Sequence, residues 1–102
     1  MLDDVMLIVN QIVNKYQPKQ VLLFGSQANG TATIKSDIDL CVVLNTDTKR
    51  KLLTDMYCNI DVATPFDLLL YTPVEWENCI DDKSSFAYKL NANGVILYEK
   101  KA

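Results

Sequence analysis

Two aspartates separated by one residue, Asp37 and Asp39, are the side chains of this sequence best suited to bind a metal ion. They lead into an apolar run that ends at Leu44, which predicts a buried strand. Because alternate side chains of a strand share a face, both carboxylates would lie on one side while Ile38 and Leu40 enter the core. Two neighbouring negative charges are stabilised by a divalent cation, which prefers oxygen ligands. A solvated pair of acids at a strand start is the alternative interpretation.

A Gly25-Ser26 pair follows a second apolar run, from Gln20 to Phe24, and predicts a sharp turn at the end of a strand. Backbone amides after such a turn, together with the Ser26 hydroxyl, are suited to bind an anion. Taken alone, Gly-Ser is also a common loop. A phosphate-binding turn that faces two metal-binding carboxylates is the arrangement needed for metal-assisted transfer from a nucleoside triphosphate.

A third carboxylate is expected on a neighbouring strand, and Asp67 fits that position. It is the second residue of the apolar run from Phe66 to Tyr71, where a charge among apolar residues requires a reason. Asp61 is the competing candidate, but it falls at a boundary between a helix and a loop, where an exposed acid is ordinary. We therefore prefer Asp67 as the third acid.

The remaining sequence supplies the elements that would position these groups. Apolar spacing predicts helices over about 2–16 and 48–60, a helix that starts at Thr72-Pro73-Val74-Glu75, and a last helix that ends near Asn93-Gly94. Strands are expected over 20–24, 37–44, 66–71 and 95–98, with a turn over 26–36 and a left-handed glycine at Gly94. Because the second strand is apolar on both faces, helices should cover both sides of the sheet. The expected fold is α/β (α+β): one domain, residues 1–102, with a small mixed sheet of about four strands flanked by helices.

Composition excludes several kinds of protein. The 102 residues include no histidine, which removes Ser-His-Asp and Cys-His catalysis and histidine-based zinc sites. The net charge of −3 argues against stand-alone binding to nucleic acid. Neither a membrane span nor the basic start of a secretory signal is present, so a cytoplasmic protein is expected. Cys41, Cys58 and Cys79 lack metal-binding spacing and are expected to be buried, reduced thiols.

Gly25-Ser26, ten intervening residues and Asp37-Ile38-Asp39 together resemble the signature of the DNA polymerase β-like nucleotidyltransferase superfamily. More narrowly, the chain resembles the minimal nucleotidyltransferases of the MntA type, which occur beside partners that contain a HEPN domain. The resemblance covers nearly the whole chain, from the leading helix to the last strand, and includes the Thr-Pro-x-Glu segment at 72–75.

This resemblance implies a role for each motif residue. Gly25 and Ser26 would form the triphosphate-binding turn, and Asp37 and Asp39 would bind two magnesium ions. Asp67 would help to hold the catalytic metal and to activate the attacking hydroxyl. ATP would be the substrate, and AMP would pass to a tyrosine of a small helical HEPN-type toxin. The chain would then act as an antitoxin, in a homo- or hetero-oligomer.

The sequence departs from the family pattern just after the Gly-Ser pair. Many minimal members carry basic residues there, whereas this chain has the neutral Gln27 and Asn29. Charge-assisted contacts to phosphate are about twice as strong as neutral ones, so a partner is expected to complete the site. Two alternatives remain open: a module that neutralises a partner by contact with weak catalysis, and a transferase for a small molecule such as an aminoglycoside, completed by a partner subunit.

Overall fold

The computed structural model describes residues 2–25 and 38–100. The helices are α1 (Leu2–Tyr16), α3 (Lys49–Asn59), α4 (Pro73–Ile80) and α5 (Phe86–Asn93), and the strands are β1 (Gln20–Phe24), β2 (Ile38–Val43), β3 (Phe66–Tyr71) and β4 (Val95–Glu99). Each agrees with its predicted bounds to within about one residue at either end. The turn expected over 26–36 lies outside the described residues. In the part of the chain that the structure describes, no helix is long and apolar enough to cross a membrane.

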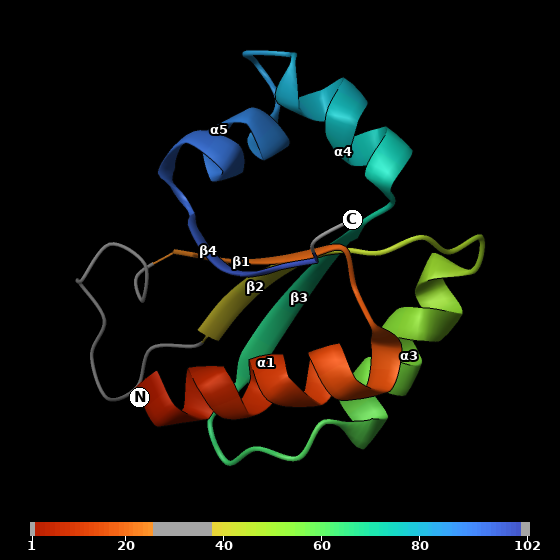
Figure 1. Cartoon of the computed structure of the whole chain (residues 1–102), viewed down its shortest axis with the longest axis vertical. Helices are drawn as coiled ribbons and strands as arrows, with labels where there is room; N and C mark the ends of the chain where they lie inside the picture. The colour runs from red at the N-terminus through yellow and green to blue at the C-terminus, as the bar shows by residue number, and fades with distance from the viewer. Residues whose placement is uncertain (1, 26–37, 101–102) are drawn as a thin grey trace.

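The four strands form one mixed sheet in the order β3-β2-β1-β4. Strand β1 runs antiparallel to both β2 and β4, while β2 and β3 are parallel. Figure 1 shows α1 and α3 on one face of this sheet and α4 and α5 on the other. The predicted α+β class, with helices on both faces of a small mixed sheet, is therefore confirmed.

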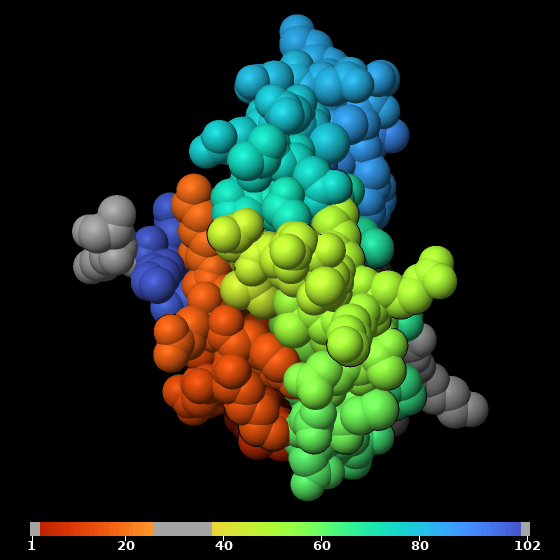
Figure 2. All heavy atoms as spheres, turned by 90° about the vertical axis from the view of Figure 1, so that its right-hand side faces the viewer, coloured from red at the N-terminus to blue at the C-terminus, as the bar shows by residue number. Residues whose placement is uncertain are grey.

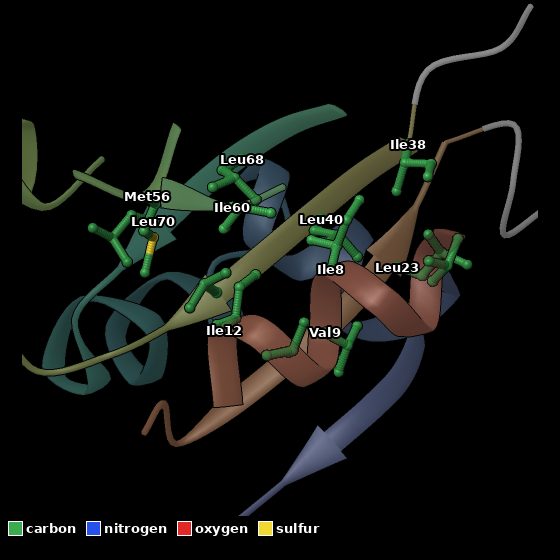
Figure 3. Close-up of a cluster of buried hydrophobic side chains, with 13 residues drawn as sticks. Ile8, Val9, Ile12, Leu23, Ile38, Leu40, Met56, Ile60, Leu68 and Leu70 are labelled. Carbon is green, nitrogen blue, oxygen red and sulfur yellow. The ribbon is translucent and has the colours of Figure 1, made fainter. Parts of the chain in front are cut away.

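The core between the sheet and the α1/α3 layer is the larger of the two. Helix α1 buries a stripe of apolar residues at three- and four-residue spacing, and these side chains point toward the sheet in Figure 3. Ile8 and Ile12 are completely buried, as are Ile38 and Leu40 on β2. Met56 is the α3 residue that is fully buried in this layer.

A second core lies between the sheet and the α4/α5 layer. It contains Leu22 of β1, Cys41 of β2, Trp76 of α4 and Leu90 of α5, all less than 7% exposed. Strand β2 is thus buried on both faces, as its apolar run predicted. The expectation that all three cysteines are buried is wrong, because α3 presents Cys58 to solvent and Cys79 is only partly buried.

The chain enters each helix of this second layer through a side-chain cap. The Thr72 hydroxyl accepts a hydrogen bond from the backbone N–H of Glu75 (3.2 Å), and the Glu75 carboxylate accepts one from the backbone N–H of Thr72 (2.9 Å). This is the predicted capping box. The Ser85 hydroxyl likewise accepts from the backbone N–H of Tyr88 (3.0 Å). These caps fix the points at which α4 and α5 start.

Gly94 ends α5 in a way that the sequence did not predict. Its φ of −74° and ψ of 165° are extended, so the expected left-handed conformation is wrong. A side chain is excluded there by crowding instead, since an added Cβ would lie 2.5 Å from the Leu90 carbonyl oxygen and 3.2 Å from that of Leu23. Gly94 therefore lets the end of α5 come close to β1.

Hydrogen bonds between α1 and the end of α3 complete the other layer. The Gln11 amide donates to the Asp61 carbonyl (2.9 Å) and accepts from the Asp61 backbone N–H (2.8 Å). Tyr16 donates to the Asp55 carboxylate (2.6 Å). In Figure 2, which looks onto α3 (yellow-green), α1 (orange) lies beside it accordingly.

Candidate active site

Asp39 and Asp67 lie side by side on neighbouring strands. They are paired in the parallel β2–β3 ladder, in register between Ile38↔Phe66 and Leu40↔Leu68. Neighbouring strands are about 4.8 Å apart, and paired residues of a parallel ladder point to the same face. The two carboxylates therefore share one side of the sheet.

The packing of their neighbours identifies that side. Ile38 and Leu40 are buried in the core beneath α1, and so is Leu68 of β3. Alternation along each strand consequently puts Asp39 and Asp67 on the opposite face, which α4 and α5 cover farther along the strands. Asp39 is partly buried there, and Asp67 is exposed.

The backbone of Gly25 lies against the Asp39 carboxylate. Gly25 follows β1 directly, and its φ of +76° is in the left-handed region that favours glycine. A Cβ added at Gly25 would overlap with Oδ2 of Asp39 and lie 3.3 Å from its Cγ. The pairing of Phe24 with Asp39 across the antiparallel β1–β2 ladder creates this approach. Gly25 directly after Phe24 thus has a backbone conformation that suits the predicted turn, and it lies at the predicted metal-binding acid Asp39.

The interior next to the carboxylates is apolar and uncharged at neutral pH. Cys41, two residues along β2 from Asp39 on the same face, is fully buried, and burial raises the pKa of its thiol to about 12. Burial is also the main cause that raises the pKa of Tyr71, at the far end of β3. Neither group is ionised near neutral pH, so the buried part of this face adds no charge next to the carboxylates.

The two candidates for the third acid lie in different parts of the molecule. Asp67 is the register partner of Asp39, whereas Asp61 follows the C-terminal end of α3. Gln11 of α1 binds the backbone of Asp61 from the other layer. The geometry thus brings Asp67 to Asp39 and leaves Asp61 in the α1/α3 layer.

Two of the predicted site residues, Ser26 and Asp37, lie outside the described residues, and so do Gln27 and Asn29. Their roles stay predictions from the sequence. Within residues 2–25 and 38–100, no group of three or more Cys, Asp or Glu side chains is arranged to hold a metal ion. The structure describes two of the three predicted acids, Asp39 and Asp67.

The donor set of these two acids fits magnesium. Both offer carboxylate oxygens, the ligand type that Mg²⁺ prefers, and the metal commonly uses one or two carboxylates besides phosphate oxygens and water. The exposure of Asp67 leaves room for such further ligands. Asp39 and Asp67 are the described residues that would hold the ion.

A hollow of about 340 Å³ opens beside Gly25, between the end of β1 and α5. It is lined by Phe24, Gly25, Phe86, Lys89, Leu90, Asn93 and Gly94. None of the α5 residues of this hollow is among the site residues predicted from the sequence. The sequence feature that could have identified them is their spacing. Phe86, Lys89 and Asn93 are three or four residues apart, which puts them on one side of the helix. A larger, open depression of about 780 Å³ runs along α3 between Asp47 and Cys58, and neither Asp39 nor Asp67 lines it.

Paired carboxylates beside a glycine turn on a mixed sheet are suited to bind a divalent cation and phosphate groups. Comparison with known proteins identifies the family. Residues 8–102 match the family model described as polymerase beta, nucleotidyltransferase. The chain therefore belongs to the polymerase β nucleotidyltransferase family.

The fold is also found in a solved structure. The crystal structure of a candidate nucleotidyltransferase from Sulfolobus solfataricus matches with a TM-score of 0.63 and 21% sequence identity. The match covers 98% of this chain and 81% of the other. At this identity the likeness shows a shared fold. No protein of curated function matches the chain significantly.

Proposed function

We propose that this nucleotidyltransferase moves AMP from ATP to a hydroxyl group in a magnesium-dependent reaction. One observation carries the proposal: Asp39 and Asp67 are paired on one face of the sheet, and the backbone of Gly25 touches Asp39. In support of the proposal, Gly25, the first residue of the predicted triphosphate-binding turn, lies next to Asp39. Family membership supports nucleotidyl transfer as the reaction type.

In the proposed reaction, the acceptor oxygen attacks the α-phosphorus of ATP. A new P–O bond forms, the bond from the α-phosphorus to the bridging oxygen of the β-phosphate breaks, and pyrophosphate leaves. The hydroxyl proton passes to the Asp67 carboxylate, which is exposed and so can be reached by an acceptor. Bound magnesium would supply charge neutralisation on the phosphates and lower the pKa of the acceptor hydroxyl.

We further propose that the acceptor is a tyrosine of a small helical protein, a toxin of the HEPN type, and that the chain acts as its antitoxin. Support comes from the resemblance to the minimal nucleotidyltransferases. The neutral Gln27 and Asn29 are consistent with a site that a partner completes.

The test is co-purification of the chain with the product of its neighbouring gene, followed by intact mass measurement. With ATP and Mg²⁺, the expected result is the mass of one or more AMP groups added to the partner. Peptide sequencing should place the adduct on tyrosine, and an Asp39→Asn chain should leave the partner unmodified. If neither protein gains a nucleotide from any of the four common triphosphates, the protein-modifying function is wrong.

Neutralisation by contact is the second candidate, favoured by the neutral residues after the Gly-Ser pair. The Asp39→Asn variant separates it from the first. If cells that express the partner are still protected by this variant, contact is sufficient. A transferase for a small molecule would instead modify an aminoglycoside that is added to the same mixture. The modification would be detected as an increase in the mass of the aminoglycoside.

A further inference from the structure

We propose that the hollow between β1 and α5 binds the adenosine part of ATP, with Phe86 against the base and Lys89 against the phosphates. This inference rests on the nucleotidyl transfer proposed above and names the residues that would recognise its substrate. None of them belongs to the predicted catalytic motif.

The hollow adjoins the site because both include Gly25. The same residue lines the hollow and touches the Asp39 carboxylate. A triphosphate bound at this turn would therefore reach the acids at one end and the hollow at the other. The volume of about 340 Å³ lies within the range of ligand-binding pockets, which starts at about 300 Å³.

Phe86 presents an aromatic surface that the fold itself does not use fully. It is the first residue of α5, and half of its surface is exposed (50%). Its ring packs edge-on against Phe24, with centroids 5.6 Å apart and an interplanar angle of 83°. Phe24 is paired with Asp39, so the aromatic pair is held at a fixed position relative to the acids. Such a ring can stack against a nucleobase.

Lys89 supplies the positive charge that the Gly-Ser turn lacks. It is exposed, lines the hollow together with Gly25, and forms no ion pair with a described residue. Its ammonium group is thus available to a phosphate rather than engaged by a carboxylate. Gln27 and Asn29 cannot provide this charge, so Lys89 adds one cation of this chain to the phosphate contacts that a partner would complete.

Asn93 and Gly94 complete the hollow at the end of α5. The Asn93 amide carries both donors and an acceptor, the combination that pairs with the N6 and N7 edge of adenine. Gly94 leaves the space next to the Leu23 carbonyl free of a side chain, since a Cβ would come within 3.2 Å of that oxygen. One helix face thus offers a ring, a cation and an amide in succession.

The experiment is a titration of the whole chain with ATP and, separately, with adenosine, in the presence of Mg²⁺. NMR chemical shifts of the chain measure the affinity for each ligand. Phe86→Ala should lower the affinity for both ATP and adenosine by roughly tenfold, because both carry the base on which the ring stacks. Lys89→Gln should weaken ATP by roughly fivefold and leave adenosine unchanged, and Lys89→Arg should restore ATP binding. Phe86→Leu, which keeps apolar volume against Phe24, should give the same loss as Phe86→Ala if stacking is responsible.

Two variants outside the hollow serve as matched controls. Tyr88→Ala removes another partly exposed aromatic ring of α5, and Lys83→Gln removes another exposed lysine of the α4/α5 layer. Neither residue lines the hollow, so both variants should bind ATP and adenosine as the unmodified chain does.

The outcomes separate this inference from the proposed function. If the chain binds ATP and Asp39→Asn removes the effect of Mg²⁺, but the Phe86 and Lys89 variants bind normally, the adenosine site is wrong and the transferase stands. If the controls weaken binding as much as the hollow variants, the effect is not local and the inference is also wrong. If the unmodified chain binds no nucleotide, with or without Mg²⁺, both proposals fall.

Discussion

Asp39 of β2 and Asp67 of β3 are register partners in a parallel ladder, on the face opposite to the α1 core. They are 28 positions apart in the sequence (39 to 67), yet they lie side by side on adjacent strands. The parallel pairing puts both side chains on the same face of the sheet.

Asp67→Asn should abolish most nucleotidyl transfer while the fold is retained. The amide keeps the size of the side chain but loses the charge and the proton-accepting oxygen, and the position is exposed, so stability should change by less than about 0.5 kcal/mol. We expect the transfer rate to fall by at least about 100-fold, which corresponds to about 2.7 kcal/mol of lost transition-state stabilisation. A steady-state assay with thermal unfolding of the same sample measures both. Asp61→Asn is the matched control and should be as active as the unmodified chain.

Gly25→Ala should disturb the site more than its small size suggests. The left-handed φ of +76° disfavours a residue with a Cβ by about 1–2 kcal/mol, and the added Cβ would push against the Asp39 carboxylate. We expect lower stability and a loss of activity of at least about tenfold. Chemical denaturation and the transfer assay give the two quantities.

Gly25→Asn separates the two causes. Asparagine tolerates the left-handed region but also carries a Cβ, so it relieves the backbone strain and retains the overlap with Asp39. If overlap matters, Gly25→Asn should be more stable than Gly25→Ala and no more active. Recovery of full activity in Gly25→Asn would show that the approach of Gly25 to Asp39 is unimportant.

Most of the fold could be predicted from the sequence because its elements are locally consistent. Three local patterns each predict one structure: the apolar spacing in α1 predicts a helix, the Thr72/Glu75 capping box a helix start, and the two-sided apolar run of β2 a buried strand. All three are confirmed. The sequence favours Asp67 as the third acid on a neighbouring strand, but its exact pairing with Asp39 depends on strand order and register, which no local pattern encodes. The hollow beside Gly25 and the crowding at Gly94 arise from the approach of α5 to β1, which only the three-dimensional structure shows.

Stability should fall at alkaline pH because of Cys41. Burial raises the pKa of its thiol from an ordinary value of 9.0 to about 12, so the folded chain keeps a proton that the unfolded chain loses. The resulting stabilisation is fully present below pH 9.0 and is lost as the pH rises toward about 12. The slope contributed by one such group is at most about 1.4 kcal/mol per pH unit. Urea unfolding at a series of pH values should show this decline, and Cys41→Ala should make it shallower.

Tyr16 should contribute to the same decline. Burial, with the hydrogen bond and the charge of Asp55, raises the pKa of its phenol from 10.0 to about 12. The stabilisation that comes from Tyr16 is therefore present below pH 10.0 and is lost as the pH approaches 12. Tyr16→Phe should be less stable at neutral pH by about 1 kcal/mol, since the hydrogen bond to Asp55 is lost, and should show a flatter alkaline limb. If stability falls as steeply at alkaline pH in this variant and in Cys41→Ala as in the unmodified chain, the raised pKa values of Tyr16 and Cys41 are wrong.

Tyr57→Phe should loosen the strand that carries Asp67. The Tyr57 hydroxyl accepts a hydrogen bond from the backbone N–H of Leu68 (2.7 Å), and its ring stacks on Phe66 with centroids 5.3 Å apart. Tyr57 of α3 thus fixes both sequence neighbours of Asp67 on β3, which is an edge strand of the sheet. Without the hydroxyl the stack remains, but the Leu68 N–H loses its partner, at a cost of about 1 kcal/mol.

Hydrogen exchange of the Leu68 amide gives the direct measurement and should be faster in Tyr57→Phe than in the unmodified chain. Transfer activity should fall by roughly tenfold, the effect typical of losing a residue that orients a metal ligand, and higher Mg²⁺ should restore part of it. Tyr88→Phe is the matched control, because no hydrogen bond from its hydroxyl joins it to a described residue. It should leave stability, exchange and activity unchanged. Equal activity of the two variants, with faster exchange in Tyr57→Phe alone, would show that the hydrogen bond supports the sheet edge and does not position Asp67.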